Sequence, residues 1–166
     1  GAAAVPLDAY PGAAAAYIVV ADGRPLWVRQ PAAARQPASL AKLLTALVLL
    51  EQDWRADARI PVSARAAGIE GSRLGLRAGE SLIARDALVA LLVRSANDAC
   101  VALAEHAAGC VEKFAMRMNA RAAALGLQDS RFVHPCGLDA PGQRTSARAS
   151  ETRWSRTFNR SSCCWR

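Results

Sequence analysis

The sequence predicts an α+β domain, in which one β-hairpin near the N-terminus is followed by a cluster of helices. Two β-rich runs around a turn dipeptide, within residues 13 to 29, indicate the hairpin. An apolar segment that ends near Leu50 and later helical patterns that stop at Gly109 and Gly126 indicate the helices. A length of 166 residues allows one such domain, or slightly more, with a sizeable core.

The composition excludes several classes of protein. A hydrophobic fraction of 52% with 21% charged residues is not that of a disordered or collagen-like chain. The longest apolar run, Leu43 to Leu50, is far shorter than the ~20 residues of a membrane helix. The formal net charge of +7 comes from scattered arginines, without clustering among aromatics, so we expect no nucleic-acid partner. No signal peptide is visible, so we expect a chain that is cytoplasmic or already processed.

The cysteines form no recognisable framework, because their number is odd and their spacing irregular. Neither His106 nor His134 completes a metal-ligand spacing with them. We therefore expect small buried or incidental thiols and no metal. The five cysteines are Cys100, Cys110, Cys136, Cys163 and Cys164.

The first elements of the chain are predicted from local turn and helix signals. Asp22-Gly23 favours a tight hairpin turn. A helix is expected to begin near Pro37, because proline suits the first helical position, and to extend to Leu50. Its apolar residues lie on every face, so we expect it to be buried and central. The strands are expected at residues 16–20 and 26–28.

The remaining chain is predicted to alternate between irregular segments and helices. Residues 53 to 79 contain four glycines and no clear period, so we expect them to be irregular. Ser81 is expected to cap the next helix, and Asp98 the one after it, which ends at Gly109. Helices are predicted at residues 82–93, 98–109 and 111–125, the last with Phe114, Met118, Ala122 and Leu125 on one face, and a loop at residues 127–143.

Lys42 carries the first chemical signal, because a charged ammonium in an apolar helix is costly unless it is paired or deprotonated. Ser39 lies one turn earlier on the same face. A serine hydroxyl needs an adjacent base to become a nucleophile, and a desolvated lysine can be that base. The N–H of Ser39 in the first helical turn suits a developing oxyanion. In the alternative interpretation, Ser39 only satisfies the helix start and Lys42 extends to the surface.

Ser95 and Asn97 are the second pair of chemical interest, in a short loop between two predicted helices. The hydroxyl can relay a proton, and the amide can bind a substrate carbonyl. By itself the pattern Ser-x-Asn is common, and a role of Asn97 or Asp98 as a helix cap explains it better.

Together these motifs resemble the serine penicillin-recognising family, and more closely its low-molecular-weight D-alanyl-D-alanine carboxypeptidases. Residues 37–45 are similar to the nucleophile helix of that family, and residues 91–99 to its second motif. Class A β-lactamases share S-x-x-K but usually carry S-D-N and an E-x-x-L-N loop, whereas this chain has S-A-N and no such loop. Shorter matches at residues 75–80, 114–119, 125–127, 137–139, 141–143 and 145–148 extend the resemblance over about residues 13 to 148.

The resemblance implies a β-lactamase/transpeptidase-like fold and a serine-type D-Ala-D-Ala carboxypeptidase. Ser39 would be the acylated nucleophile, with Lys42 as its base. Ser95 would relay the proton, and Asn97 would hold the amide of the substrate. The implied substrates are peptidoglycan stem peptides that end in D-Ala-D-Ala, with β-lactams as their mimics. No cofactor is implied, and the location would be extracytoplasmic, in the periplasm or cell envelope.

One departure from the family concerns its third motif, K-T-G, which is absent because no lysine follows Lys113. We therefore expect a truncated or frameshifted chain without the C-terminal strands of the sheet. Residues 1–148 would form a partial catalytic domain, and residues 149–166 a divergent, disordered basic tail. Without those strands we expect the apolar residues around Leu43, Leu47 and Leu50 to be partly exposed.

Two alternative functions remain open at this point. The first is a catalytically defective fragment of the family, which has the nucleophile helix but no complete site. The second is a binding module that uses the basic tail.

Overall fold

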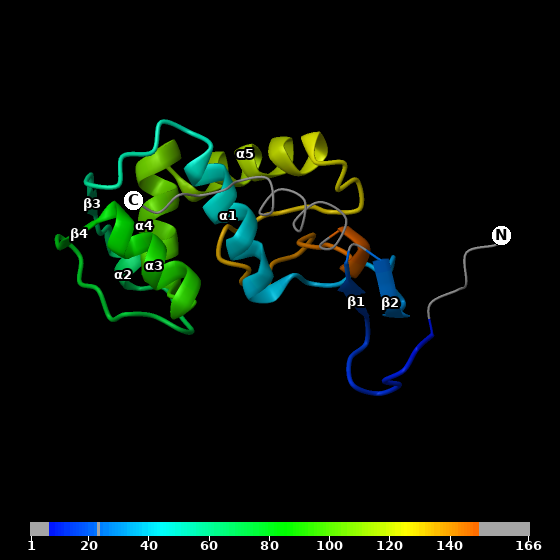
Figure 1. Cartoon of the computed structure of the whole chain (residues 1–166). Helices are drawn as coiled ribbons and strands as arrows, with labels where there is room; N and C mark the ends of the chain where they lie inside the picture. The colour runs from blue at the N-terminus through cyan, green and yellow to red at the C-terminus, as the bar shows by residue number, and fades with distance from the viewer. Residues whose placement is uncertain (1–6, 23, 150–166) are drawn as a thin grey trace.

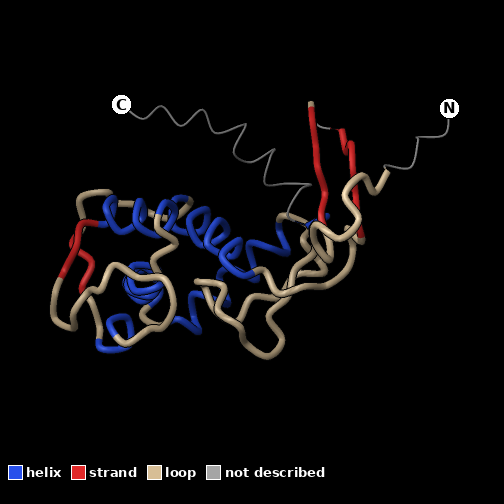
Figure 2. The backbone as a smooth tube through the Cα atoms, turned by 90° about the horizontal axis from the view of Figure 1, so that it is seen from below, coloured by secondary structure: helices blue, strands red, loops and turns tan. Residues whose placement is uncertain are grey.

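Helices form most of the regular secondary structure, with a small antiparallel sheet at each of two opposite ends (Figures 1 and 2). The computed structural model describes residues 7–22 and 24–149. The elements in chain order are β1 (Tyr17–Ala21), β2 (Arg24–Arg29), the 3-10 turn η1 (Ala38–Leu40), α1 (Ala41–Leu50), β3 (Arg59–Pro61), α2 (Ala64–Ala67), β4 (Ser81–Ile83), α3 (Ala84–Val93), α4 (Asn97–Ala108) and α5 (Val111–Ala124).

The predicted hairpin is confirmed, because β1 and β2 pair antiparallel. Tyr17 lies opposite Arg29, and Val19 lies opposite Trp27, with a bulge directly after Val19. Asp22 adopts a positive φ of 50°, as a tight turn requires, and Gly23 lies outside the described residues. The hairpin therefore forms a two-stranded ribbon beside the helices.

The helical cluster is built around α4, which contacts α1, α2, α3 and α5. Its first eight residues are all buried. Eight of the ten residues of α1 are also buried, so the prediction of a central helix that is apolar on every face is confirmed. The α-helix begins later than predicted, because Ala38 to Leu40 form a 3-10 turn after Pro37.

Two predictions for residues 53–83 are wrong. Ser81 does not cap a helix; it begins β4, and α3 starts only at Ala84. The segment that was expected to be irregular contains β3 and α2, and Ile60 of β3 pairs with Leu82 of β4. These elements have three or four residues, too few for a period in the sequence to reveal them.

The boundaries of α3, α4 and α5 agree with the predictions within about two residues, but the predicted N-cap of α4 is wrong. Ala96, not Asp98, occupies the N-cap of α4, and it makes no side-chain capping bond. Gly109 ends α4 with a φ of 82°, a left-handed conformation that glycine adopts easily. The predicted apolar face of α5 is buried, with Phe114, Met118, Ala122 and Leu125.

The expectation that the cysteines are free thiols is wrong for two of them. Cys100 in α4 and Cys136 in the loop after α5 form a disulfide, with Cα atoms 5.9 Å apart. A separation of 36 residues gives no sequence signal for this pair, which only the packing of the loop against α4 brings together. Cys110 is a free cysteine at the N-cap of α5, and Cys163 and Cys164 lie outside the described residues.

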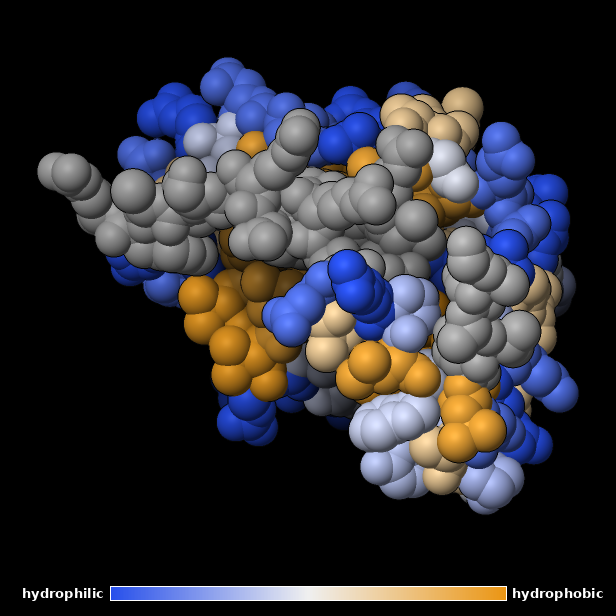
Figure 3. Space-filling model, turned by 45° about the vertical axis from the view of Figure 1, so that its right-hand side comes forward, coloured by the Kyte–Doolittle hydropathy of each residue, from blue (hydrophilic) through white to orange (hydrophobic). Residues whose placement is uncertain are grey.

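The expected exposure of α1 is only partly correct. Leu50 is 40% exposed, but Leu47 is buried. On the face drawn in Figure 3, the visible apolar surface forms several separate patches with hydrophilic residues beside them. The predicted tail lies outside the described residues except for Ala149, which is buried in the core and so belongs to the folded part. Among the described residues, no helix has the length and apolar character that a membrane crossing needs.

Candidate active site

The fold brings together three of the four predicted site residues. Ser39 lies in η1, Lys42 lies one turn later in α1, and Ser95 lies at the junction of α3 and α4. The Ser39 Oγ is 2.9 Å from the Ser95 Oγ and 3.5 Å from the Lys42 Nζ. Two hydroxyls and an amine are therefore close enough for a proton to pass among them.

Both turns that carry the hydroxyls contain non-glycine residues with positive φ. Ser95 has a φ of 54°, and Ala38, directly before Ser39, has a φ of 45°. This conformation costs about 1–2 kcal/mol in an L-residue, so the surrounding structure must hold it. The turn at Ser95 is held by hydrogen bonds from Ser72 Oγ to the Arg94 carbonyl and from the Ala96 N–H to the Ala90 carbonyl. Strain of this kind is typical of functional sites.

Lys42 is buried, with 4% of its surface exposed. Burial lowers the pKa of its ammonium to about 8. Within the described residues it pairs with no carboxylate; its Nζ donates a hydrogen bond of 2.7 Å to the Cys136 carbonyl. With this pKa, about a tenth of the molecules carry a neutral Lys42 amine at pH 7, which is the form that accepts a proton.

Asn97, the fourth predicted residue, makes no hydrogen bond to Ser39, Lys42 or Ser95, and its side chain bonds to the loop after α2. Its Nδ2 donates to the Glu70 carbonyl at 2.7 Å, and its backbone N–H donates to the Ser72 carbonyl. Gly71 has a φ of 83° and lies so close to Asn97 that a Cβ atom there would be 2.8 Å from the Nδ2. The Asn97 Oδ1 is buried and has no hydrogen-bond partner within the described residues. This oxygen is the polar atom of Asn97 whose hydrogen-bonding capacity remains unused.

Asp98 holds the other side of the same loop. Its buried carboxylate accepts hydrogen bonds from the backbone N–H groups of Leu74, Gly75 and Leu76, and from that of Ala99. Burial by itself raises the pKa of Asp98, but these N–H groups outweigh it and keep the pKa below its usual value. Asp98 therefore fixes residues 74–76 against the start of α4.

Sequence reasoning missed the contribution of the loop after α5. The Cys136 carbonyl is the acceptor for Lys42, and Gly137 lies against Ala38. Gly137 has a φ of 77°, which only glycine adopts without strain. The glycine was the available signal, although the sequence does not show what the loop contacts.

A hollow of about 410 Å³ is lined by Pro37 and Leu40, which flank the turn that carries Ser39, although Ser39 itself is not part of its walls. Leu40, Arg35 and Thr145 contribute to its walls, together with Ile18 and Val20 of β1. Apolar walls with one guanidinium suit a peptide that carries a carboxylate. Within the described residues, no group of His, Cys, Asp and Glu side chains could hold a metal ion.

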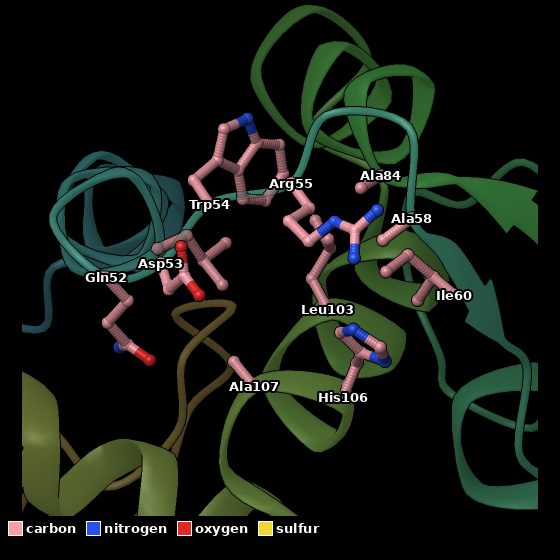
Figure 4. A pocket seen from close by; sticks show the side chains of 11 residues that line it. Gln52, Asp53, Trp54, Arg55, Ala58, Ile60, Ala84, Leu103, His106 and Ala107 are labelled. Atoms are coloured by element: carbon pink, nitrogen blue, oxygen red, sulfur yellow. The ribbon is translucent and has the colours of Figure 1, made fainter.

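A second pocket, of about 300 Å³, lies at the opposite end of α1 (Figure 4). Figure 4 shows Arg55 and His106 on one side of it and Gln52 and Asp53 on the other. Its walls contain no serine, threonine, cysteine or lysine. The pocket therefore offers no hydroxyl, thiol or amine nucleophile and is separate from the site at Ser39.

Comparison with known proteins identifies related sequences. Residues 5–152 match the family model Peptidase_S11, D-alanyl-D-alanine carboxypeptidase. The chain is 35% identical over 115 residues to the D-alanyl-D-alanine carboxypeptidase DacF of Bacillus subtilis, covering 67% of this chain and 30% of that protein. It is 34% identical over 117 residues to a D-alanyl-D-alanine endopeptidase of Pseudomonas aeruginosa, covering 70% and 38%. The chain thus spans about a third of the length of these relatives.

Solved structures show the same likeness. The D-alanyl-D-alanine carboxypeptidase DacD of Francisella tularensis superposes with a TM-score of 0.79 at 30% identity, covering 88% of this chain and 37% of that one. The D-alanyl-D-alanine carboxypeptidase of Mycobacterium tuberculosis H37Rv superposes with a TM-score of 0.77 at 33% identity, covering 90% and 56%. The α+β arrangement of hairpin and helices is therefore that of penicillin-binding proteins.

Proposed function

The chain belongs to the D-alanyl-D-alanine carboxypeptidase family Peptidase_S11, and from this we propose that it forms an acyl-enzyme through Ser39 on peptides ending in D-Ala-D-Ala. The observation that carries the proposal is the position of the Ser39 Oγ between the Ser95 Oγ, at 2.9 Å, and the buried Lys42 Nζ, at 3.5 Å. A hydroxyl beside an amine whose pKa is about 8 is suited to nucleophilic attack at neutral pH.

In the proposed reaction, the Ser39 Oγ attacks the carbonyl carbon of the penultimate D-alanine. The neutral Lys42 amine accepts the hydroxyl proton as the new C–O bond forms. The Ser39 N–H, which has no partner within the described residues, is a donor for the oxyanion. The C–N bond then breaks, and the proton passes through the Ser95 hydroxyl to the amine of the departing D-alanine. Water hydrolyses the acyl-serine with Lys42 again as base.

Asn97 is proposed to hold the substrate amide. Its Nδ2 is engaged by the Glu70 carbonyl, so the unpartnered Oδ1 is the atom proposed to accept a backbone N–H from the peptide. The hollow beside Leu40 is proposed to take the side chains next to the scissile bond. β-Lactams would enter as mimics of the peptide, and the stem peptides place the reaction in the periplasm or cell envelope.

A second candidate is a chain that is acylated without the turnover of a complete carboxypeptidase, because the described residues supply a nucleophile, a base and a relay. The proposed partial domain is revised to end at or after Ala149, since that residue is buried in the core.

Mass spectrometry of the intact chain after incubation with penicillin tests the proposal. We expect one added acyl group, which the variant Ser39→Ala does not acquire. Ser81→Ala, at an exposed strand, is the matched control and should be acylated like the wild type. Equal labelling of wild type and Ser39→Ala would contradict the assignment. Acylation without release of D-alanine from a D-Ala-D-Ala peptide would favour the second candidate.

A further inference from the structure

We propose that the Cys100–Cys136 disulfide positions the nucleophile and its base, by fixing residues 135–137 against the start of α1. The inference rests on the proposed function of Ser39 and Lys42. Cys100 and Cys136 are not themselves reacting groups. They act through the loop of residues 135–137, which their disulfide anchors.

Three consecutive residues of this loop contact α1 and the turn before it. The Pro135 carbonyl accepts a hydrogen bond of 2.7 Å from the Thr45 hydroxyl. The Cys136 carbonyl accepts one of 2.7 Å from the Lys42 Nζ. Gly137 lies directly against the carbonyl group of Ala38. The loop thus runs antiparallel to the first turns of the helix, and any displacement of it changes the surroundings of base and nucleophile together.

The disulfide joins this loop to the helix that carries the rest of the site. Cys100 lies in α4, one turn after Asn97 and five residues after Ser95. Both cysteines are buried, Cys100 completely. The disulfide therefore connects the loop that accepts the Lys42 hydrogen bond to α4, which begins directly after the turn of Ser95.

Three other hydrogen bonds around Cys136 are local. The N–H groups of Val133 and His134 both donate to the Gln143 Oε1, and the Cys136 N–H donates to the His134 Nδ1. These three bonds maintain the shape of the loop. Asn119 of α5 also holds it, since its side chain bonds to the N–H and the carbonyl of Phe132, and the Cys136 Sγ lies 3.7 Å from the Asn97 carbonyl. The covalent link from the loop to α4 is the disulfide, and the two carbonyl contacts link it to α1.

The chemical consequence concerns the direction of the Lys42 lone pair. When the amine is neutral, one N–H can remain on the Cys136 carbonyl, which leaves the lone pair free to face the Ser39 Oγ. The same loop helps to exclude water from Nζ, and burial is what lowers the pKa of Lys42 to about 8. His134 is the titratable group of the loop that interacts with the charge of Lys42, since that charge helps to lower the pKa of His134, after desolvation and Arg65.

The test is a titration of the Lys42 Nζ by NMR in protein labelled with ¹⁵N-lysine. Lys42 and Lys113 are the only lysines of the sequence, and the exposed Lys113 is an internal reference. In the wild type we expect a midpoint of about 8 for Lys42. In the variant Cys100→Ala/Cys136→Ala we expect the midpoint to move toward 10.5 by about one unit or more, because water reaches Nζ. The matched control is Cys110→Ser, which changes the free cysteine and keeps an N-cap acceptor.

The acylation rate with penicillin is the second measurement. If the midpoint rises by one unit, acylation at pH 7 should fall about tenfold and recover toward the wild-type rate at high pH. A merely structural disulfide would lower the rate equally at all pH values. An unchanged midpoint and pH profile in a cooperatively folded double variant would overturn the inference.

Two further outcomes can be separated. If the wild type is not acylated at all, the proposed function fails, and the Lys42 midpoint alone decides the inference. If the double variant does not fold, the titration is made on the wild type before and after reduction with dithiothreitol. That reagent converts the disulfide to two thiols and closes to its own cyclic disulfide. A midpoint that is the same in both forms would overturn the inference.

Discussion

Gly137 lies so close to Ala38, the residue before the candidate nucleophile, that a Cβ atom at position 137 would overlap the Ala38 carbonyl. The contact is between two backbones, so no side-chain rotation can relieve it. It joins the loop that accepts the Lys42 hydrogen bond to the turn that presents Ser39.

Gly137→Ala is therefore expected to destabilise the protein by about 2–4 kcal/mol, from the positive φ and from the overlap with Ala38. Gly109→Ala is the control, since Gly109 also has a positive φ but no atom within 4 Å of its Cβ position. That variant should lose only about 1 kcal/mol. Urea unfolding of both variants measures the difference, and equal losses would show that the contact at Ala38 is unimportant.

Acylation of Ser39 should depend on pH through Lys42. The base must be neutral, so the rate should rise about tenfold per pH unit below the pKa and level off above it. With the pKa lowered to about 8 by burial, the plateau should begin near pH 8. Stopped-flow or quenched labelling with a fluorescent penicillin between pH 5 and 10 gives the profile. A rate independent of pH across that range would exclude Lys42 as the base.

Lys42 should also make the stability of the fold depend on pH. Its pKa is about 8 in the folded chain and 10.5 in the unfolded one, so the unfolded state binds more protons between these values. Stability should rise with pH in that window and be lowest below pH 8, by about 3 kcal/mol for this residue. Lys42→Met should remove that dependence and be more stable at pH 7 while it loses acylation. The free energies of unfolding of the wild type and of Lys42→Met, measured between pH 7 and 10, give this dependence. A difference between them that does not change with pH would refute the prediction.

Ser95 combines a required hydroxyl with a strained backbone, at a φ of 54°. Ser95→Gly and Ser95→Ala both remove the hydroxyl next to Ser39, so both should slow acylation to a similar extent. Only glycine relieves the positive φ, so Ser95→Gly should be about 1 kcal/mol more stable than Ser95→Ala. Thermal unfolding compares the two. A less stable glycine variant would mean that the turn is not strained.

Asp98→Asn should lower stability at pH 7 by about 2–4 kcal/mol, because buried N–H groups lose a charged acceptor. The pKa of Asp98 is below its usual value in the folded chain, so its contribution is present above about pH 4 and lost as the pH falls through the lower, folded value. Asp86→Asn, with an exposed carboxylate, is the control and should change stability by less than ~0.5 kcal/mol. If the two variants lose equal stability, the bonds to Leu74, Gly75 and Leu76 do not hold their loop.

Local patterns in the amino-acid sequence were sufficient to predict those elements that are long enough to show a period or that end at a turn residue. The hairpin followed from β-rich runs around Asp22, the buried α1 from apolar residues on every face, and the ends of α4 and α5 from Gly109 and Gly126. Lys42 was conspicuous because a lysine in such a helix is costly, and Ser39 followed from its spacing on the same face.

The contacts that these residues make depend on how distant parts of the chain pack together. Ser95 is 56 positions from Ser39, and Cys136 is 94 from Lys42, so no local period links either pair. The disulfide and the hydrogen bond from the Asn97 Nδ2 to the Glu70 carbonyl likewise arise from how the loops after α2 and α5 pack on α4. Long-range contacts are fixed by the packing of the whole core, in which the position of each helix depends on its neighbours. Local patterns in the sequence do not give the distance between residues that are far apart along the chain.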